Sequence, residues 1–453
     1  IKDIEPLQHL TKLKKLNLRE NVISDLNPLT DLTKLDYLNV HSNPVETGIE
    51  VLGNLLNLET LIMRNVPVGE TYHFLENLTK LHRLNMRNTG IADVSVIGQL
   101  MAAGALQDKP EEGIVATIDL LEIDLIGEDI DPYRELRKYW DNISYRYPLS
   151  LPYYPSSVNP PVFSYDSGFY AKEFYLTLST DVPNGRIFFT LDGSDPALTP
   201  DLEPLGSTFE YDQPIFLQNR SDQPNHLANI RTVSLWAEYV PPSEVFKGSV
   251  LRAVVLDSKG NRSDVITQSY FIDEQMMGRY SLPIVSITTN PAYLFDDEIG
   301  IYVPGNLYTP LGPDQRWSED NSNFFQRGLK WERPVHFQMF DLNGNEVIGF
   351  DAGIRIHGNF TRLFNQKSLR LYAREEYDGI GLMEYDFFPD LNNRLSENSV
   401  DSFKTLILRN GGNGWLEAYF RDVLAHSLVE HMKLDIQGYK PVIIFINGEY
   451  WGI

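Results

Sequence analysis

Leucine recurs with a fixed period along the first part of the chain. Residues 13–21 read LKKLNLREN and residues 35–43 read LDYLNVHSN, so both fit the pattern L-x-x-L-x-L-x-x-N. Weaker copies follow at 58–66 and 81–89, and one leucine of each copy recurs at intervals of 22, 23 and 23 residues: Leu16, Leu38, Leu61 and Leu84. Each copy predicts one short strand whose leucines enter a shared core, followed by a turn that asparagine closes.

This period is typical of a leucine-rich-repeat solenoid, which we predict for residues 1–110. In the last two copies the asparagine comes one residue early, at Asn65 and Asn88. We therefore expect the ladder of asparagines along the solenoid to be imperfect.

Residues 111–150 differ from the repeats. The run GIVATIDLLEIDLIGED predicts a closing strand, and DPYRELRKYWDNI begins with Asp131 and Pro132, a favourable helix start. Because the end of a repeat array needs a cap, we predict a solenoid cap and linker here. The proline-rich stretch 147–163 predicts an extended linker.

Residues 160–274 have the pattern of an all-β domain. Alternating or β-rich runs are bounded by turn residues: EFYLTLSTD, GRIFFTLDGS, GSVLRAVVLDS and VITQSYFID. The sequence DGSDP at 192–196 predicts an Asx-rich turn, because no glutamate stands at the bidentate position of a calcium loop. The segment FTLDGSDPALTP resembles the chitobiase/β-hexosaminidase C-terminal-type domain, an immunoglobulin-like module, which implies an Ig-like β-sandwich without chemistry of its own. Its aromatic residues leave carbohydrate binding as a lesser possibility.

Residues 281–453 predict an α+β domain in the order strand, glycine-containing loop, strand, strand, helix, strand, strand. Asn343-Gly344 and Asn447-Gly448 predict tight hairpin turns, a run at 403–409 a buried strand, and apolar residues at 416, 420, 424 and 428 one face of a helix. This order is that of a protein-kinase small lobe, although the usual three-glycine loop and V-A-I-K motif are absent.

One lysine breaks the pattern of this domain. In the stretch 352–374, Lys367 shares one strand face with Leu369 and Leu371, whereas Ser368, Arg370 and Tyr372 share the other. A lysine on the apolar face indicates either a frayed strand end or a cation placed inside a pocket.

Several motifs of this domain occur in an order similar to that of the spore-coat-protein-H (CotH) kinase-like family. They are SLPIVSITTNPAYLFDDEIGIY, WERPVHFQMFD, AGIRIHGNFTRLFNQKSLRLYAREEY, FKTLILRNGGNGW, YFRDVLAHSL and YKPVIIFINGEYWGI. The resemblance implies an atypical protein-kinase fold, ATP-dependent phosphorylation of secreted or surface proteins, and a divalent metal, Mg or Mn. The fold class that we expect is therefore multidomain: a leucine-rich-repeat solenoid, an Ig-like β-sandwich and the α+β small lobe of an atypical protein kinase.

The resemblance places the family's motifs on specific residues of this chain. They fall on Arg355, His357, Gly358, Arg362, Lys367, Ser368, Arg409, Asn410, Arg421, Asp422, Asn447, Gly448 and Glu449. The resemblance makes Lys367 the first choice for contacting phosphate. A conventional kinase carries its lysine on the strand directly before the helix, here 403–409, so Lys404 and Arg409 are the alternatives.

Other candidates have a plain structural interpretation beside the functional one. Glu417 is the acid that could hold the phosphate-binding lysine, but Glu417 and Arg421 are four residues apart and could form a surface pair. His357 could be a hydrogen-bonded structural residue.

The resemblance also implies where the catalytic acids should lie. In kinases they lie on the large lobe, after the hinge, and we expect them beyond Ile453. The chain begins and ends within recognisable elements, so we expect a fragment that binds nucleotide poorly and catalyses nothing.

Composition narrows the remaining functions. The formal charge of −23 argues against a nucleic-acid partner, and no apolar run is long enough to span a bilayer. The absence of cysteine excludes disulfides and thiolate metal sites. We predict an exported bacterial protein, extracellular or at the cell surface, whose repeats bind a protein partner or substrate. The alternative is a non-catalytic surface adhesin or scaffold.

Overall fold

The computed structural model folds into two compact units, Ile1–Pro152 with Leu198–Glu203, and Tyr153–Ala197 with Pro204–Ile453. Each unit is described by itself. The structure describes the whole chain except the side chain of residue 134 and residues 70–71, 92, 122, 124–132, 141, 149–150, 152–155, 200, 231–239, 309–321, 390–399, 416, 433 and 435.

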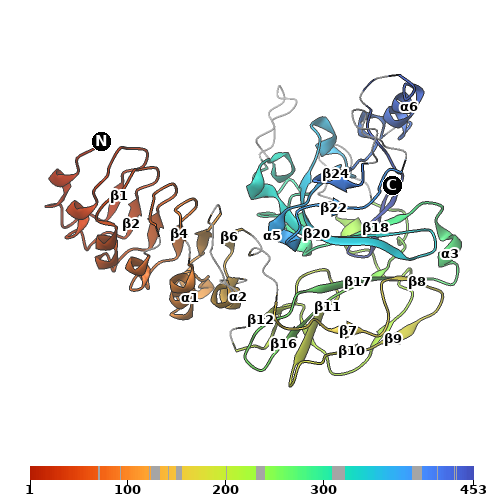
Figure 1. The fold of residues 1–453 in the computed structure, drawn as a ribbon, viewed down its shortest axis with the longest axis horizontal. Helices are drawn as coiled ribbons and strands as arrows, with labels where there is room; N and C mark the ends of the chain where they lie inside the picture. Colours follow the sequence, from red (N-terminus) through yellow and green to blue (C-terminus); the bar gives the residue numbers. More distant parts are fainter. Residues whose placement is uncertain are drawn as a thin grey trace. The chain divides into compact units, whose positions relative to one another are not determined.

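The first unit is the predicted solenoid. In its described residues, six parallel strands pair in chain order: β1 (Lys15–Asn17), β2 (Tyr37–Asn39), β3 (Thr60–Ile62), β4 (Arg83–Asn85), β5 (Thr117–Asp119) and β6 (Tyr145–Tyr147). The central residues of β1 to β5 align in register and are buried: Leu16, Leu38, Leu61, Leu84 and Ile118. Short 3-10 helices and α1 (Ser95–Ala102) return the chain to the next strand (Figure 1).

The asparagine ladder changes between the early and late repeats, as its spacing predicts. The buried amide of Asn43 donates to the carbonyl oxygens of Leu18 and Val40. In the next repeats Val66 and Thr89 occupy the corresponding buried place. Asn65 and Asn88, one position earlier, are exposed and hydrogen-bonded to each other at 3.0 Å.

The solenoid sheet continues beyond residue 110. Strands β5 and β6 extend it in register, and α2 (Arg134–Trp140) lies within the predicted helix. Asp131 and Pro132, the predicted helix start, lie outside the described residues, as does part of the predicted linker 147–163. The segment predicted as a cap therefore adds two more strands to the solenoid sheet.

The second unit begins with the predicted β-rich domain. Its main sheet has the order β14-β11-β16-β17-β8, with two smaller pairs, β10-β7 and β15-β9. The strands are β7 (Val162–Phe163), β8 (Gly168–Tyr170), β9 (Phe174–Leu176), β10 (Leu178–Ser179), β11 (Arg186–Thr190), β14 (Phe209–Glu210), β15 (Ile215–Leu217), β16 (Ser249–Leu256) and β17 (Ile266–Ile272). The DGSDP segment forms an Asx turn, because Asp192 Oδ1 accepts the N–H of Ser194 at 2.9 Å.

The rest of the second unit is built on a larger mixed sheet with the order β24-β21-β20-β19-β18-β25-β26. Its strands are β18 (Ile284–Thr288), β19 (Arg333–Phe340), β20 (Glu346–Ile356), β21 (Leu369–Tyr372), β24 (Thr405–Leu408), β25 (Ile443–Ile446) and β26 (Glu449–Gly452), and α3 (Met276–Arg279), α4 (Pro291–Phe295), α5 (Glu375–Asp378) and α6 (Arg421–Leu428) lie between strands. Both predicted hairpin turns are present, at Asn343-Gly344 and Asn447-Gly448.

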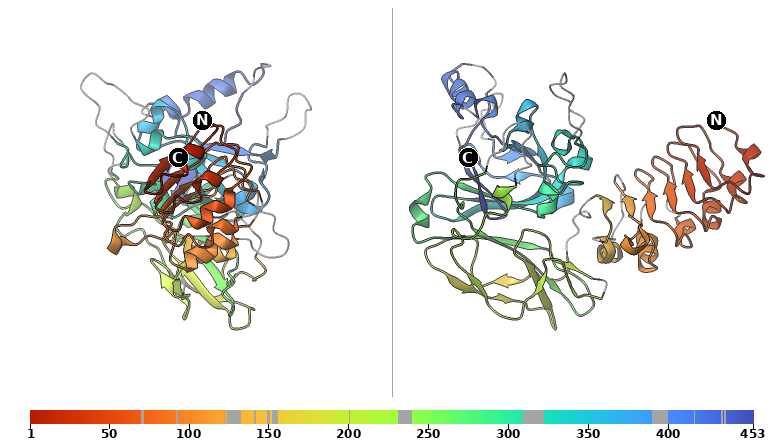
Figure 2. Two further views of the ribbon diagram at one scale, coloured as in Figure 1. Left: turned by 90° about the vertical axis from the view of Figure 1, so that its left-hand side faces the viewer. Right: turned by 180° about the vertical axis from the view of Figure 1, so that it is seen from behind.

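The two sheets of this unit join through apolar and polar contacts on one face of the larger sheet. Phe271 on β17 packs against Phe340 and Phe445 of the larger sheet, with ring centres 5.5 Å and 4.9 Å away. The Oγ of Ser269 on β17 lies 3.0 Å from the Oγ of Ser286 on β18 and donates to Gln338 on β19 at 2.7 Å. The opposite face of the larger sheet is apolar and buried, with Ile287, Phe337 and Leu371 in its core. The right-hand view of Figure 2 shows this unit from behind, with its β-rich domain in yellow to green and the strands of the larger sheet in green to blue.

Two predictions for the end of the chain need correction. The strand predicted as buried, β24, lies at the edge of the sheet and is only half-buried, because it has a neighbour on one side. The predicted helix starts later, at Arg421, and Leu424 and Leu428 on its apolar face are 48% and 66% exposed. Residue 416 of that face lies outside the described residues.

Candidate functional site

The glycine-containing loop 357–366 connects β20 to β21 and is held from inside by an arginine. The buried guanidinium of Arg362 donates to the carbonyl oxygens of Gly358 and Phe324 at 2.7 Å and of Ile356 at 2.8 Å. Because a guanidinium has five N–H donors, these bonds use most of its capacity. Arg362, predicted to bind the cofactor, therefore fixes the loop.

Lys367 lies in the core directly after this loop. Its Nζ donates to the carbonyl oxygens of Arg362 at 2.7 Å and Phe364 at 2.8 Å, and it lies 4.3 Å from the ring centre of Phe324. The residue is 3% exposed. Burial, with the nearby charge of Arg362, lowers the pKa of Lys367 well below its usual value. In this conformation the side-chain nitrogen of Lys367 binds the loop and is not presented to solvent, so the geometry does not support the phosphate contact predicted for Lys367.

Ser368 and Asn410 form a second support of the loop. The Ser368 hydroxyl donates to the side-chain oxygen of Asn410 at 2.8 Å, and the Asn410 amide donates to the carbonyl of Gln366 at 2.6 Å. Both side chains are buried. They join β21 to the turn after β24, which is a structural role.

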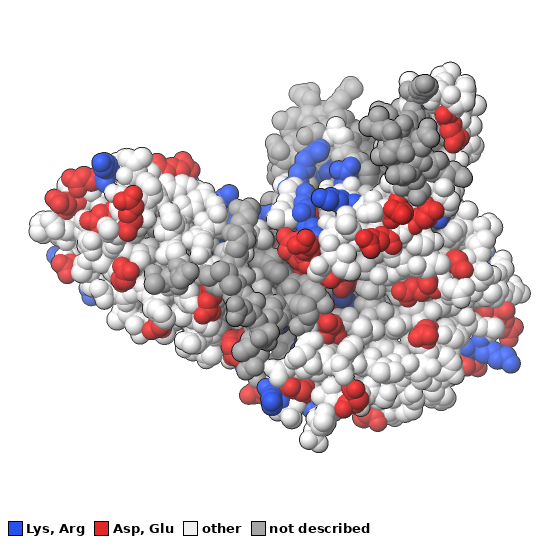
Figure 3. Space-filling model, in the orientation of Figure 1, with Lys and Arg blue, Asp and Glu red and all other residues white. Residues whose placement is uncertain are grey.

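Cationic side chains gather on the face of β20, β21 and β24 that lies opposite Lys367 and the apolar core. Arg355 is paired with Arg370 in the sheet register, and Arg370 with Ile407, so these side chains share one face. His357 and Arg409 follow two residues further along β20 and β24 and continue that face. In the space-filling view, Lys and Arg side chains gather over this end of the sheet (Figure 3).

The electrostatic field at His357 shows how positive this place is. The pKa of His357 is lowered, first by burial and then by the charges of four arginines: Arg370, Arg362, Arg409 and Arg327. No carboxylate is among the causes of this shift. The arrangement disfavours a proton on the ring, and it would favour an anion bound beside it.

Arg370 is the most available cation of this face. Its Nε is buried and has no hydrogen-bond partner, and within the described ranges its guanidinium forms no ion pair. A buried donor without a partner costs stability, so a ligand that accepts its hydrogen bond would be favoured. Alternation along the strand predicts Arg370 on the face opposite Lys367, but none of the family motifs marks it as a site residue.

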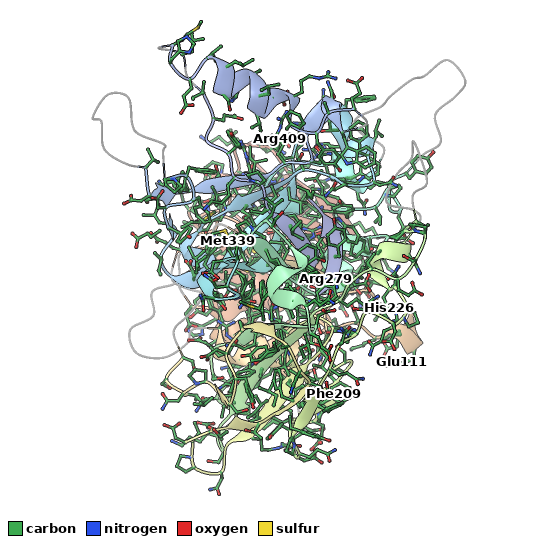
Figure 4. All side chains as sticks on the ribbon, turned by 90° about the vertical axis from the view of Figure 1, so that its right-hand side faces the viewer. Glu111, Phe209, His226, Arg279, Met339 and Arg409 are labelled. Atoms are coloured by element: carbon green, nitrogen blue, oxygen red, sulfur yellow. The ribbon has the colours of Figure 1, made fainter. Side chains whose placement is uncertain are left out.

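The other predicted candidates are already paired. Glu332, with a side chain 1% exposed, binds Arg355 at 2.5 Å and Arg374 at 2.7 Å. Arg409 forms an ion pair with Asp422, so the arginine predicted as a rival to Lys367 is held at the surface end of β24. Figure 4 shows Arg409 at the end of this unit opposite Phe209.

Glu417 and Arg421, predicted as site residues near the helix, form the ion pair that the structural interpretation predicted. Glu417 and Arg421, four residues apart, are ion-paired, with side chains 62% and 55% exposed. Lys404 precedes β24 at the end opposite Arg409, and it is exposed. A four-residue strand is about 13 Å long, which separates Lys404 from the loop.

The described residues contain no group of three or more acidic or histidine side chains placed to hold a metal ion. No helix in the described part of the chain has both the length and the apolar character that crossing a bilayer requires. The predicted Mg or Mn therefore stays a prediction.

Comparison with known families agrees with the order of motifs. Residues 354–453 match the family described as CotH kinase protein, and residues 176–270 match the family described as Fn3 associated. Neither match covers half of the chain. The β-rich domain thus matches an Fn3-associated family, and its resemblance to the chitobiase type stays a prediction.

Two solved structures are similar to parts of the chain. Internalin C2 of Listeria monocytogenes is 33% identical over 22% of this chain and 43% of that chain, with a TM-score of 0.21. A leucine-rich-repeat protein of Leptospira interrogans is 20% identical over 32% of this chain and 33% of that chain, with a TM-score of 0.26. The chain thus spans less than half the length of either. A search of curated proteins found no match.

Proposed function

We propose that the C-terminal domain is a kinase-like domain of the CotH type and that its cationic face binds the phosphates of a nucleotide. The cationic face is formed by His357, Arg370 and Arg409 on the face of β20, β21 and β24 opposite Lys367, where Arg409 is also paired with Asp422. The observation that carries the proposal is the buried, unpartnered Nε of Arg370, which lies beside His357 together with the charges of Arg362, Arg409 and Arg327. The CotH match over residues 354–453 supports the choice of nucleotide.

The residues of this face fit a phosphate group chemically. A guanidinium offers parallel N–H donors that match two phosphate oxygens, and Arg370 has a donor to spare. Arg362 and Lys367 act indirectly, because they hold the adjacent loop in its shape. ATP would supply the phosphoryl group, and a Mg or Mn ion would be held largely by the phosphates themselves.

The activity proposed for the whole protein is ATP-dependent phosphorylation of secreted or surface proteins, with the solenoid binding a protein partner or substrate. An exported protein, extracellular or at the cell surface, is part of the same proposal. The solenoid fold of the first unit supports the binding role, because repeat solenoids present extended surfaces.

Nucleotide binding by residues 1–453 tests the proposal. We expect MgATP and tripolyphosphate to bind weakly in calorimetry, with a dissociation constant on the order of 1 mM. Arg370→Ala should weaken both ligands about tenfold, because it removes charge-assisted hydrogen bonds. The matched control is Arg186→Ala, which removes a half-buried arginine paired with Glu210 in the β-rich domain.

The outcomes separate the two candidate functions. Equal binding by Arg370→Ala and Arg186→Ala would refute the assignment of the cationic face. Absence of any MgATP or tripolyphosphate binding, with partner binding retained by the repeats, would favour the non-catalytic adhesin or scaffold. Tripolyphosphate binding as tight as that of MgATP would show that the face recognises phosphate and not the base.

A further inference from the structure

A row of basic side chains crosses the strands of the solenoid. The residue two positions after each of the first four strands is basic: Arg19, His41, Arg64 and Arg87. Each follows a buried core residue, respectively Leu18, Val40, Met63 and Met86. Because side chains alternate along an extended segment, the four basic side chains lie on the outer side of the sheet. We call these four residues the basic row.

The backbone keeps the members of the basic row side by side. The N–H after each member donates to the carbonyl of the next one: Glu20 to His41 at 2.8 Å, Ser42 to Arg64 at 2.9 Å and Asn65 to Arg87 at 3.0 Å. The donors Glu20, Ser42 and Asn65 share a left-handed backbone, with φ of 57°, 55° and 56°. Neighbouring strands lie about 4.8 Å apart, so the row is about 14 Å long.

Within the part of the chain that the structure describes, two members of the basic row form no ion pair. Within the described residues Arg19 and Arg64 have no ion-pair partner, and the Glu20 carboxylate lies 4.0 Å from His41. The charges of Arg87 and Arg64 also act on Asp119 of β5, so one carboxylate lies near that end of the row. Residues 1–110 contain eleven Lys and Arg against thirteen Asp and Glu, a net charge of −2 in a chain of −23.

We propose that the basic row is the docking surface for an extended, acidic segment of a partner protein. The inference names the class of partner and rests on the proposed protein-binding role of the repeats. In an extended peptide, alternate side chains lie on one side about 6.6 Å apart, so three carboxylates cover about 13 Å. That length matches the row, and the opposite charges favour this orientation over others.

Binding of model peptides to residues 1–453 tests the inference. A fluorescein-labelled peptide in which glutamate alternates with serine should bind in fluorescence anisotropy, and the peptide with glutamine in place of glutamate should not. Binding should weaken as salt rises from about 50 mM to about 200 mM, because exposed charges are then screened.

Charge reversal locates the surface. Arg19→Glu with Arg64→Glu should weaken the glutamate peptide at least about tenfold. The matched control, Lys12→Glu with Lys34→Glu, makes the same change of charge at exposed positions outside the strands and should have little effect. Both double variants should unfold at the same temperature as the parent protein.

Three results would overturn the inference: equal binding of the glutamate and glutamine peptides, equal weakening by the two double variants, or binding of dextran sulfate without binding of the glutamate peptide. The peptide comparison uses the unchanged protein, so it decides the question even if a variant fails to fold. MgATP binding is measured on the same samples, so failure of the basic row is distinguishable from failure of the cationic face.

Discussion

The side-chain nitrogen of Lys367 donates to the carbonyl oxygen of Phe364 at 2.8 Å, across the end of the glycine-containing loop. A second carbonyl, that of Arg362, accepts at 2.7 Å. A neutral lysine amine has two N–H donors, so it can make both bonds without carrying a charge into the core. The lowered pKa of Lys367, caused first by burial, agrees with this arrangement.

Lys367→Met should destabilise the protein by about 1–3 kcal/mol, because two buried carbonyl groups lose their donor while the side-chain volume is kept. Urea unfolding measures the loss. The matched control is Lys172→Met, at an exposed position of the β-rich domain, which should change stability by less than about 0.5 kcal/mol. Equal effects of the two changes would contradict the role given to Lys367.

The same residue should make stability depend on pH. The folded pKa of Lys367 is lowered, whereas the unfolded chain keeps a value of about 10.4. Between these two pKa values the unfolded state binds more protons, so the free energy of unfolding rises with pH in that window. The difference in stability between the parent and Lys367→Met should therefore grow as pH rises toward about 10. A difference that is constant with pH would show that Lys367 keeps its proton on folding.

The repeats could be predicted almost completely from the sequence, and the loop around Lys367 only in part. The period of leucines sets the register of the solenoid strands, because each repeat contacts mainly its neighbours. Alternation also placed Lys367 on the buried face of its strand. Its partners could not be predicted, since Phe324 and the carbonyls of Arg362 and Phe364 come together only through the fold of the whole domain.

The alternation of side chains along β21 indicates the position of Arg370, although the lysine of a kinase motif does not point to it. The alternation that buries Lys367 places Arg370 on the opposite, half-buried face. Its importance depends on Arg409 and His357, which reach the same face from other strands. Likewise, the apolar period of α6 predicted a helix but not its exposure, because periodicity does not tell whether a surface covers that face.

Glu332 should be the most sensitive acid of the larger sheet. Its buried carboxylate accepts hydrogen bonds from Arg355, Arg374 and the hydroxyl of Tyr377. Glu332→Gln leaves two arginines without their counter-charge, so we expect a loss of about 3–5 kcal/mol in urea unfolding. Glu210→Gln, which breaks the exposed pair with Arg186, should lose at most about 1 kcal/mol. Similar losses at the two sites would refute this ranking.

Glu449, the acid of the N-G-E motif, should control a loop of the β-rich domain. Its carboxylate accepts the backbone N–H groups of His226 at 2.7 Å and Ala228 at 2.9 Å. Glu449→Gln replaces one accepting oxygen with an N–H₂ group that faces a donor, so the two amides should exchange hydrogen faster. Hydrogen exchange with mass spectrometry measures this over the loop. Glu298→Gln, at an exposed position, is the control, and unchanged exchange in Glu449→Gln would contradict the assignment.

Gly448, at the turn of the last hairpin, should tolerate no side chain. Its φ is 82°, and a Cβ there would overlap the carbonyl oxygen of Gly248. The N–H of Gly248 donates to the carbonyl oxygen of Gly448, so the two segments are in close contact. Gly206 has a φ of 64° and open space around its Cβ position, so Gly206→Ala measures the backbone cost alone, about 1–2 kcal/mol. Gly448→Ala adds a backbone overlap, which should raise the loss by about 1–3 kcal/mol. Equal losses in urea unfolding would show that the hairpin can move away from Gly248 without cost, and hence that this contact does not hold the two sheets together.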